Sequence, residues 1–149
     1  QPPHPPVPPF LTPTAAYALF YNNSATGATY ATGENIAYQS TLYNTATADI
    51  VNNNGLITLS GGTTGKAYLV NYQVTGETAN DATLALAING TVDSNSEIIP
   101  NSATGTSNGS YIVNVPANST STVALRVVSG TVTTASPTVG SYFSVIRIA

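Results

Sequence analysis

Apolar and polar residues alternate in short runs along most of the chain. In residues 66–76, for example, Tyr68, Val70 and Tyr72 fall on one side of an extended segment. A period of two predicts a β-strand, because successive side chains of a strand point to opposite faces. Runs that share this pattern lie at 16–21, 36–44, 49–51, 55–62, 66–76, 82–92, 96–100, 109–116, 121–132 and 140–149.

The spacing of these runs predicts an all-β fold. Gly, Asn and Ser separate the runs, and the Asn89-Gly90 dipeptide is typical of a tight hairpin turn. No segment shows the period of a helix. Many short antiparallel strands joined by polar turns are typical of a sandwich or a jelly roll. We therefore expect one antiparallel jelly-roll sandwich over residues 15–149.

Several predicted strands are apolar on both faces. In residues 142–148, Phe143 and Val145 lie on one face, while Tyr142 and Ile146 lie on the other. An antiparallel sheet with one face in water would instead show one polar face. The second face is therefore covered either within the domain or by other copies of the chain. Nine tyrosines favour other copies, because tyrosine can pack its ring in an interface while its hydroxyl stays hydrogen-bonded.

Residues 1–14 differ from the rest of the chain, since seven of the first 13 residues are proline. We expect them to form an extended connector in the polyproline II conformation, which rises about 3.1 Å per residue. Val7, Phe10 and Leu11 lie among the prolines, where they can enter pockets of a neighbouring subunit. We favour this docking interpretation over a disordered linker that contacts nothing.

Charged residues are scarce, with three basic and six acidic residues, a net charge of -3 and a charged fraction of 6%. About a quarter is usual in globular proteins. The sequence offers no basic patch for nucleic acid or for an anionic membrane, so we expect neither partner. The absence of cysteine excludes disulfides and thiolate metal sites. This composition is most typical of a secreted or surface-displayed protein.

The order of several motifs resembles that of a known family. The motifs are "GLITL", "GKAYLVNYQV", "LAINGT", "VPANSTSTVALRV" and a terminal "SVIRIA". In this order they resemble the C-terminal domain of the BclA-like, collagen-like proteins of the spore surface, the exosporium. That family is similar in fold to tumour necrosis factor and the complement globular heads. The resemblance covers most of residues 16–149 and implies a tumour-necrosis-factor-like jelly roll that forms trimers and has no catalytic residues.

The resemblance also suggests how the protein is used. Its two-sided strands assign the trimer interface to Tyr68, Tyr72, Phe143, Val145 and Arg147. Where the family has collagen repeats, this chain has the Pro-rich connector instead. We therefore interpret the protein as a structural subunit of an extracellular fibre, by analogy an endospore appendage, whose connectors join trimers head to tail. The alternative is a trimeric head of a surface or phage fibre that binds surface glycans or a receptor.

Few residues could take part in catalysis or bind a metal. Ser-His-Asp chemistry needs a positioned histidine base, and the only histidine is His4 in the connector. Asp93, Asn95 and Glu97 place oxygen atoms at alternate positions, as a calcium loop does, but the glycine and the distal carboxylate of such a loop are missing. We interpret both features as solvated segments and expect no enzyme, cofactor or metal ion.

Lys66 is the only lysine and begins an apolar strand. One interpretation is a strand end whose ammonium group reaches solvent. The other is an isopeptide bond to an Asn or Asp side chain, which requires a buried amine and a nearby carboxyl acid such as Glu34, Asp49 or Glu77. We expect Arg147 to pair with a carboxylate, or with carbonyl groups near the trimer axis.

Overall fold

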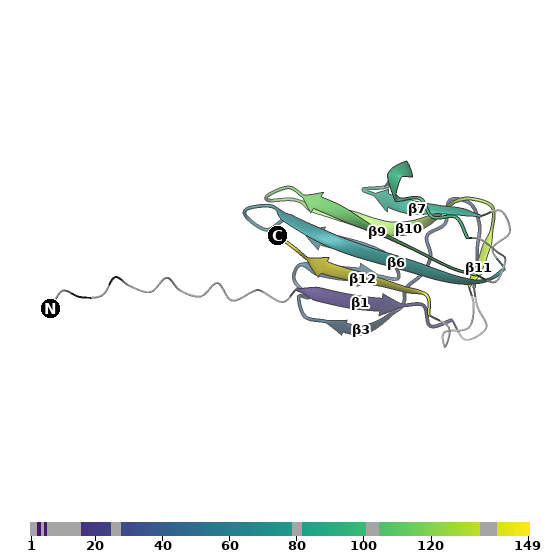
Figure 1. Cartoon of the computed structure of the whole chain (residues 1–149), viewed down its shortest axis with the longest axis horizontal. Helices are drawn as coiled ribbons and strands as arrows, with labels where there is room; N and C mark the ends of the chain where they lie inside the picture. Colours follow the sequence, from purple (N-terminus) through teal and green to yellow (C-terminus); the bar gives the residue numbers. More distant parts are fainter. Residues whose placement is uncertain are drawn as a thin grey trace.

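The computed structural model describes residues 3, 5, 16–24, 28–78, 82–100, 105–134 and 140–149. Figure 1 shows a β-sandwich whose long strands follow its longest axis. Helical structure within the described residues is limited to one 3₁₀ turn, η1 (Ser94–Ser96). The all-β fold predicted from the alternation is therefore confirmed.

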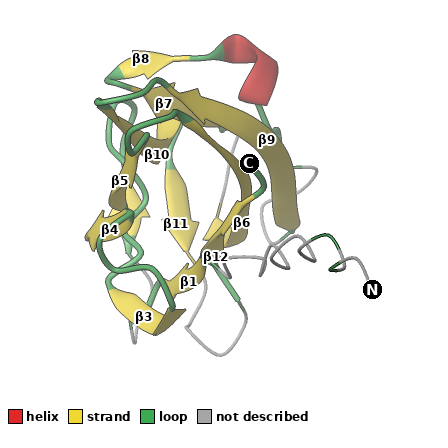
Figure 2. Ribbon diagram, turned by 90° about the vertical axis from the view of Figure 1, so that its left-hand side faces the viewer, coloured by secondary structure: helices red, strands yellow, loops and turns green. Residues whose placement is uncertain are grey.

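Two antiparallel sheets face each other, as Figure 2 shows. The larger, seven-stranded sheet has the order β2-β11-β6-β12-β1-β3, and β9 also pairs with β6. Its strands are β1 (Tyr17–Tyr21), β2 (Thr29–Tyr30), β3 (Ser40–Asn44), β6 (Lys66–Thr78), β9 (Thr106–Val115), β11 (Val132–Thr134) and β12 (Tyr142–Arg147). The smaller, five-stranded sheet has the order β4-β5-β10-β7-β8. Its strands are β4 (Ile50–Asn53), β5 (Leu56–Ser60), β7 (Thr83–Ile88), β8 (Thr91–Val92) and β10 (Thr120–Ser129).

The 13-residue strand β6 organises the larger sheet. It pairs with β9 along one edge and with β12 along the other. Side chains alternate across a strand, so Tyr68, Val70 and Tyr72 are buried while the side chains between them stay partly exposed. One strand therefore supplies both the core and the outward face of the sheet.

The hairpin predicted at Asn89-Gly90 is confirmed. These two residues join β7 to β8 with φ angles of 52° and 81°, which a tight turn of this type requires. The strand predicted at 96–100 is wrong, because the structure shows there only an isolated bridge between Ile98 and Leu84.

The strand predicted at 36–44 begins only at Ser40. The backbone N–H of Ile36 donates to the carbonyl of Leu125 in the smaller sheet at 2.8 Å, and the Ile36 and Tyr38 side chains are fully buried. This segment thus crosses from one sheet to the other. Its alternating burial resembles that of a strand, which is why the sequence pattern alone does not reveal the crossing.

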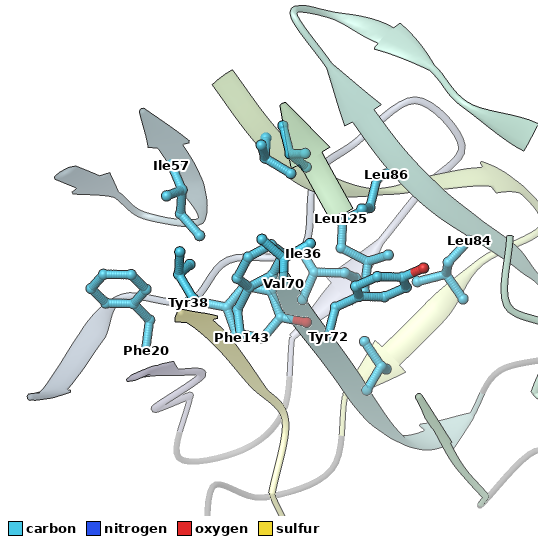
Figure 3. Close-up of a cluster of buried hydrophobic side chains, with 14 of the residues drawn as sticks. Phe20, Ile36, Tyr38, Ile57, Val70, Tyr72, Leu84, Leu86, Leu125 and Phe143 are labelled. Carbon is cyan, nitrogen blue, oxygen red and sulfur yellow. The ribbon is translucent and has the colours of Figure 1, made fainter. Parts of the chain in front are cut away.

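The core lies between the two sheets and is centred on aromatic rings. Figure 3 shows Tyr38, Tyr72 and Phe143 close together, with aliphatic side chains around them. The Tyr38 and Phe143 rings meet edge to face with centroids 5.7 Å apart. The smaller sheet contributes Ile57, Leu84, Leu86 and Leu125 to the same cluster.

Three core tyrosines satisfy their hydroxyl groups within the chain. The hydroxyls of Tyr38, Tyr68 and Tyr72 donate to backbone carbonyl oxygens at 3.0, 2.6 and 2.6 Å. Burial raises the pKa of Tyr68 and of Tyr72 to about 12, and it raises the pKa of Tyr38 further. These tyrosines therefore stabilise the core of the single chain. From the number of tyrosines in the sequence we had expected contacts between copies.

Gly109 on β9 lies directly opposite Tyr72 on β6. A Cβ atom at position 109 would come within 2.7 Å of the Cε2, Cζ and Oη atoms of Tyr72. Because the core is close-packed, the ring cannot move aside without disturbing its neighbours. The position therefore requires glycine as long as Tyr72 keeps its place.

We expect Gly109→Ala to lower the free energy of unfolding by about 1–3 kcal/mol, the usual cost of overpacking a core. Urea unfolding followed by tyrosine fluorescence measures this change. Ser110→Ala is the matched control, because Ser110 is exposed on the same strand and should change the free energy by less than about 0.5 kcal/mol. Equal stability of the two variants would contradict the packing described here.

The raised tyrosine pKa values predict alkaline destabilisation. Above pH 10 the unfolded chain loses phenolic protons that the folded chain retains, so the free energy of unfolding falls as pH rises from about 10 to about 12. Urea midpoints measured from about pH 8 to about pH 12 test this. Tyr72→Phe should weaken the pH dependence, because it removes one of the phenols whose pKa burial raises.

Candidate interaction surface

The outward face of the larger sheet holds the features that could bind another molecule. The pairing of β1, β12, β6 and β9 aligns their outward side chains in rows that cross the sheet. Small or polar side chains occupy some rows, and large apolar side chains occupy others.

The structure corrects the residues predicted for the trimer interface. Tyr68, Tyr72, Phe143 and Val145 are at most 2% exposed and lie in the core of the single chain. Both faces of their strands are apolar, so alternation could not show which face is inward. The side chains between them, such as Leu69 and Ile146, are the ones on the outward face.

One outward row is entirely apolar. Strand pairing aligns Tyr17 with Ile146, Ile146 with Leu69, and Leu69 with Ile112. Tyr17, Ile146 and Ile112 are 40%, 43% and 53% exposed. These four residues form the apolar band, a continuous stripe across four strands. A stripe of this kind on a protein with few charges is the usual mark of an association surface.

In the next two outward rows, the same face becomes polar and hollow. A cavity of about 440 Å³ is lined by Asn71, Gln73, Asn108, Ser110, Tyr142 and Ser144, with Gly109 and Tyr72 completing its wall. The small side chains of Ser110 and Ser144 leave room that larger side chains would fill. We call this the polar hollow, and none of its lining residues is charged.

A cluster of three charges joins the two sheets. Lys66 Nζ donates to Asp49 Oδ2 at 2.9 Å, and Arg147 Nη1 lies 3.6 Å from the same oxygen. Asp49 directly precedes β4 of the smaller sheet, while Lys66 and Arg147 belong to the larger one. The expected pairing of Arg147 with a carboxylate is thus confirmed, and the partner lies in the same chain.

The described fold is shared by proteins of known structure. Eiger, a tumour necrosis factor of S. frugiperda, matches with a TM-score of 0.67 at 12% identity over 91% of this chain and 93% of its own. Murine APRIL matches with a TM-score of 0.64 at 8% identity, over 91% and 100% of the two chains. Pika GITRL gives a TM-score of 0.55 at 13% identity, over 91% and 96%.

The fold is a tumour-necrosis-factor-like jelly roll. Identities this low establish the fold and no function. No protein-family model matches the sequence, and no curated protein matches it either.

The jelly roll has its chain ends at one end of the sandwich. The N–H of Arg147 donates to the Ala16 carbonyl at 2.9 Å, and the N–H of Ala67 donates to the Ala149 carbonyl at 3.1 Å. Figure 1 shows the start of β1 and the C-terminus at this end. Residues 1–14 therefore join the jelly roll beside its C-terminus.

Several predicted residues lie outside the described part of the chain. They are His4, Val7, Phe10 and Leu11 of the connector. The connector's docking role stays a prediction.

Asp93 has a structural role in the described fold. Its carboxylate accepts hydrogen bonds from the N–H of Asn95 at 3.0 Å and from the hydroxyl of Tyr111 at 2.6 Å. The Tyr111 hydrogen bond lowers the pKa of Asp93 below its usual value. This contact fixes η1 against β9.

Across the described ranges no group of three or more His, Cys, Asp and Glu side chains could hold a metal ion.

The sequence alone did not predict that the residues of the apolar band, or those of the polar hollow, lie together. Ile112 and Leu69 belong to strands far apart in sequence, and only their pairing brings them together. The available signal was the change along β12 from Tyr142 and Ser144 to Ile146 on a single face.

Within the part of the chain that the structure describes, no helix is long and apolar enough to cross a bilayer.

We expect Asp49→Asn to lower the free energy of unfolding by about 1 kcal/mol, because it removes the partner of Lys66 and Arg147 at a partly exposed site. The loss should shrink in about 1 M salt, which screens such pairs. Urea unfolding at low and high salt measures both effects. Glu97→Gln, at an exposed position, is the control and should change little. A salt-independent loss for Asp49→Asn would contradict an electrostatic role.

The same ion pair bears on the isopeptide interpretation of Lys66. A charged ammonium beside a charged carboxylate does not form an amide, so we expect the intact mass of the protein to equal the mass calculated from its sequence. An amide between Lys66 and an Asp side chain would lower the mass by one water molecule, and an amide to an Asn side chain would lower it by one ammonia molecule. Mass spectrometry of the boiled, denatured chain distinguishes the two interpretations.

Proposed function

We propose that this protein is a structural, non-enzymatic subunit of an extracellular fibre, built from trimeric jelly-roll heads that the Pro-rich connectors link head to tail. The resemblance of the sequence to BclA-like proteins supports an endospore surface as its location. Self-association is the central activity of such a subunit. Its partners are further copies of the same chain.

The apolar band is the observation that best supports this proposal. Ile112 and Ile146 hold exposed aliphatic side chains on a paired sheet face, where water contact is unfavourable. Packing the bands of three copies around an axis would remove these side chains from water. Three copies close into a ring when each contacts its two neighbours through different parts of this face, because a heterologous contact of this kind closes if its rotation is threefold.

The connector supports linkage between trimers. It joins each jelly roll at the end that holds the C-terminus, and about thirteen residues in polyproline II conformation span roughly 40 Å. Three connectors leaving one trimer would act together, so modest individual contacts give a strong joint through high effective concentration. Because the contact joins unlike surfaces, it continues into an open filament.

A second candidate function is a trimeric head that binds neutral sugars. The polar hollow favours it, because uncharged amides, hydroxyls and a tyrosine ring suit a sugar. In that case the connector would be dispensable for assembly. The fibre proposal requires the connector.

We expect Ile112→Asp to weaken association by at least about 100-fold, because an unpaired carboxylate buried in an interface costs several kcal/mol. Sedimentation velocity over a range of concentrations would show monomers of this variant. Val51→Asp is the matched control, since Val51 is 50% exposed on the smaller sheet and Ile112 is 53% exposed. The control should assemble like the native chain.

Near-ultraviolet circular dichroism confirms that both variants keep the native core. Two results would contradict the proposed interface. One is assembly of Ile112→Asp at the same concentrations at which the native chain assembles. The other is dissociation of Val51→Asp while Ile112→Asp stays assembled.

A further inference from the structure

The polar hollow offers hydrogen-bond donors without charge. No hydrogen bond within the described residues engages the side-chain amides of Asn71 and Asn108. Gln73 Nε2 donates one hydrogen to the Gly140 carbonyl at 2.8 Å and keeps its second hydrogen. An uncharged occupant that is rich in acceptors can therefore bind in the hollow through these donors.

Aromatic rings border the same site. Strand pairing places Tyr21 of β1 beside Tyr142 of β12, and both side chains lie on the outward face and are partly exposed. Aromatic-lined grooves are a usual means of binding a polyproline II segment, whose rings pack on the aromatic faces.

The connector has the complementary chemistry. Its seven prolines among the first 13 residues have no N–H groups, so the segment presents mainly carbonyl acceptors and pyrrolidine rings. It contains no acidic residue and no lysine or arginine. It also loses little conformational entropy on binding, because proline already fixes its backbone.

The hollow and the start of the connector lie at different positions along the sheet. The connector joins β1 near Tyr17, which pairs with Ile146, whereas the hollow extends from Ser144 to Tyr142. The hollow therefore lies two to four residues further along β12, or about 7 to 14 Å away. When heads stack in the same orientation, each connector leaves its own head at the end nearer to the apolar band. It would therefore meet the next head at the end nearer to the polar hollow.

We propose that the polar hollow is the receptor for the Pro-rich connector of another copy of this chain. The inference rests on the proposed head-to-tail fibre and specifies the contact that links one layer of heads to the next. The apolar band holds copies together within a layer, and the hollow receives residues 1–13 from the neighbouring layer. Amides of Asn71, Gln73 and Asn108 donate to the connector's carbonyls, and Tyr21 and Tyr142 pack against its prolines.

Photo-crosslinking of the full chain tests this. Tyr142 is replaced by p-benzoylphenylalanine, and equal amounts of isotopically light and heavy chains are mixed, assembled and irradiated. We expect mixed light–heavy peptides that join position 142 to residues 1–13. The same substitution at Val51, which is exposed on the smaller sheet, should give no such peptides.

The outcomes separate this inference from the proposed function. Filaments without the 142-to-connector crosslink, or a crosslink within one chain only, would overturn the inference and leave the fibre intact. Binding of neutral sugars to those filaments on a glycan array would then identify the hollow's occupant. Discrete trimers with neither filaments nor crosslinks would overturn both.

A second measurement does not depend on folding of the substituted chain. An excess of a synthetic peptide of residues 1–13 should shorten filaments of the native protein at least several-fold, as seen by negative-stain microscopy. A peptide with its prolines replaced by alanine is the control. Unchanged filament length with the native peptide would contradict docking of the connector.

Discussion

The alternation of side chains along β6 is the constraint on which the rest of the structure depends. Both edges of this strand are paired, so its backbone groups are satisfied and its side chains cannot rotate from one face to the other. A shift of one residue in its pairing would place Tyr68 and Tyr72 in water and Leu69 in the core. The core tyrosines, with hydroxyls bonded inside the chain, fix that register. The same register places the side chains of the apolar band and of the polar hollow on the outward face.

The scarcity of charge determines how such a surface can be used. The Lys66, Asp49 and Arg147 cluster uses two of the three basic side chains to join the sheets. The third, Arg126, donates to Asn35 at 3.0 Å and to the Gly90 carbonyl at 3.2 Å. The contacts that we propose between copies on the outward face would therefore come from apolar packing and neutral hydrogen bonds. Such contacts would respond weakly to salt, which suits the durable extracellular fibre that we propose.

The sequence allowed prediction of the fold but only part of the surface. Alternation and the Asn89-Gly90 turn revealed an antiparallel sandwich, because these signals are local. The crossing at Ile36 and Tyr38 escaped prediction, since a buried connection shares the burial pattern of a strand. The inward and outward faces of β6 and β12 were exchanged in the predicted interface, because both faces are apolar and only the position of the second sheet distinguishes them. The polar hollow depends on the pairing of β6, β9 and β12, which are far apart in sequence.

A cryo-electron microscopy reconstruction of the assembled full-length protein tests the central claim most directly, namely that copies associate through the outward face of the larger sheet. The account predicts that Ile112 and Ile146 of each copy are buried against other copies around a threefold axis. Copies that meet instead through the smaller sheet, with the apolar band facing solvent, would contradict it.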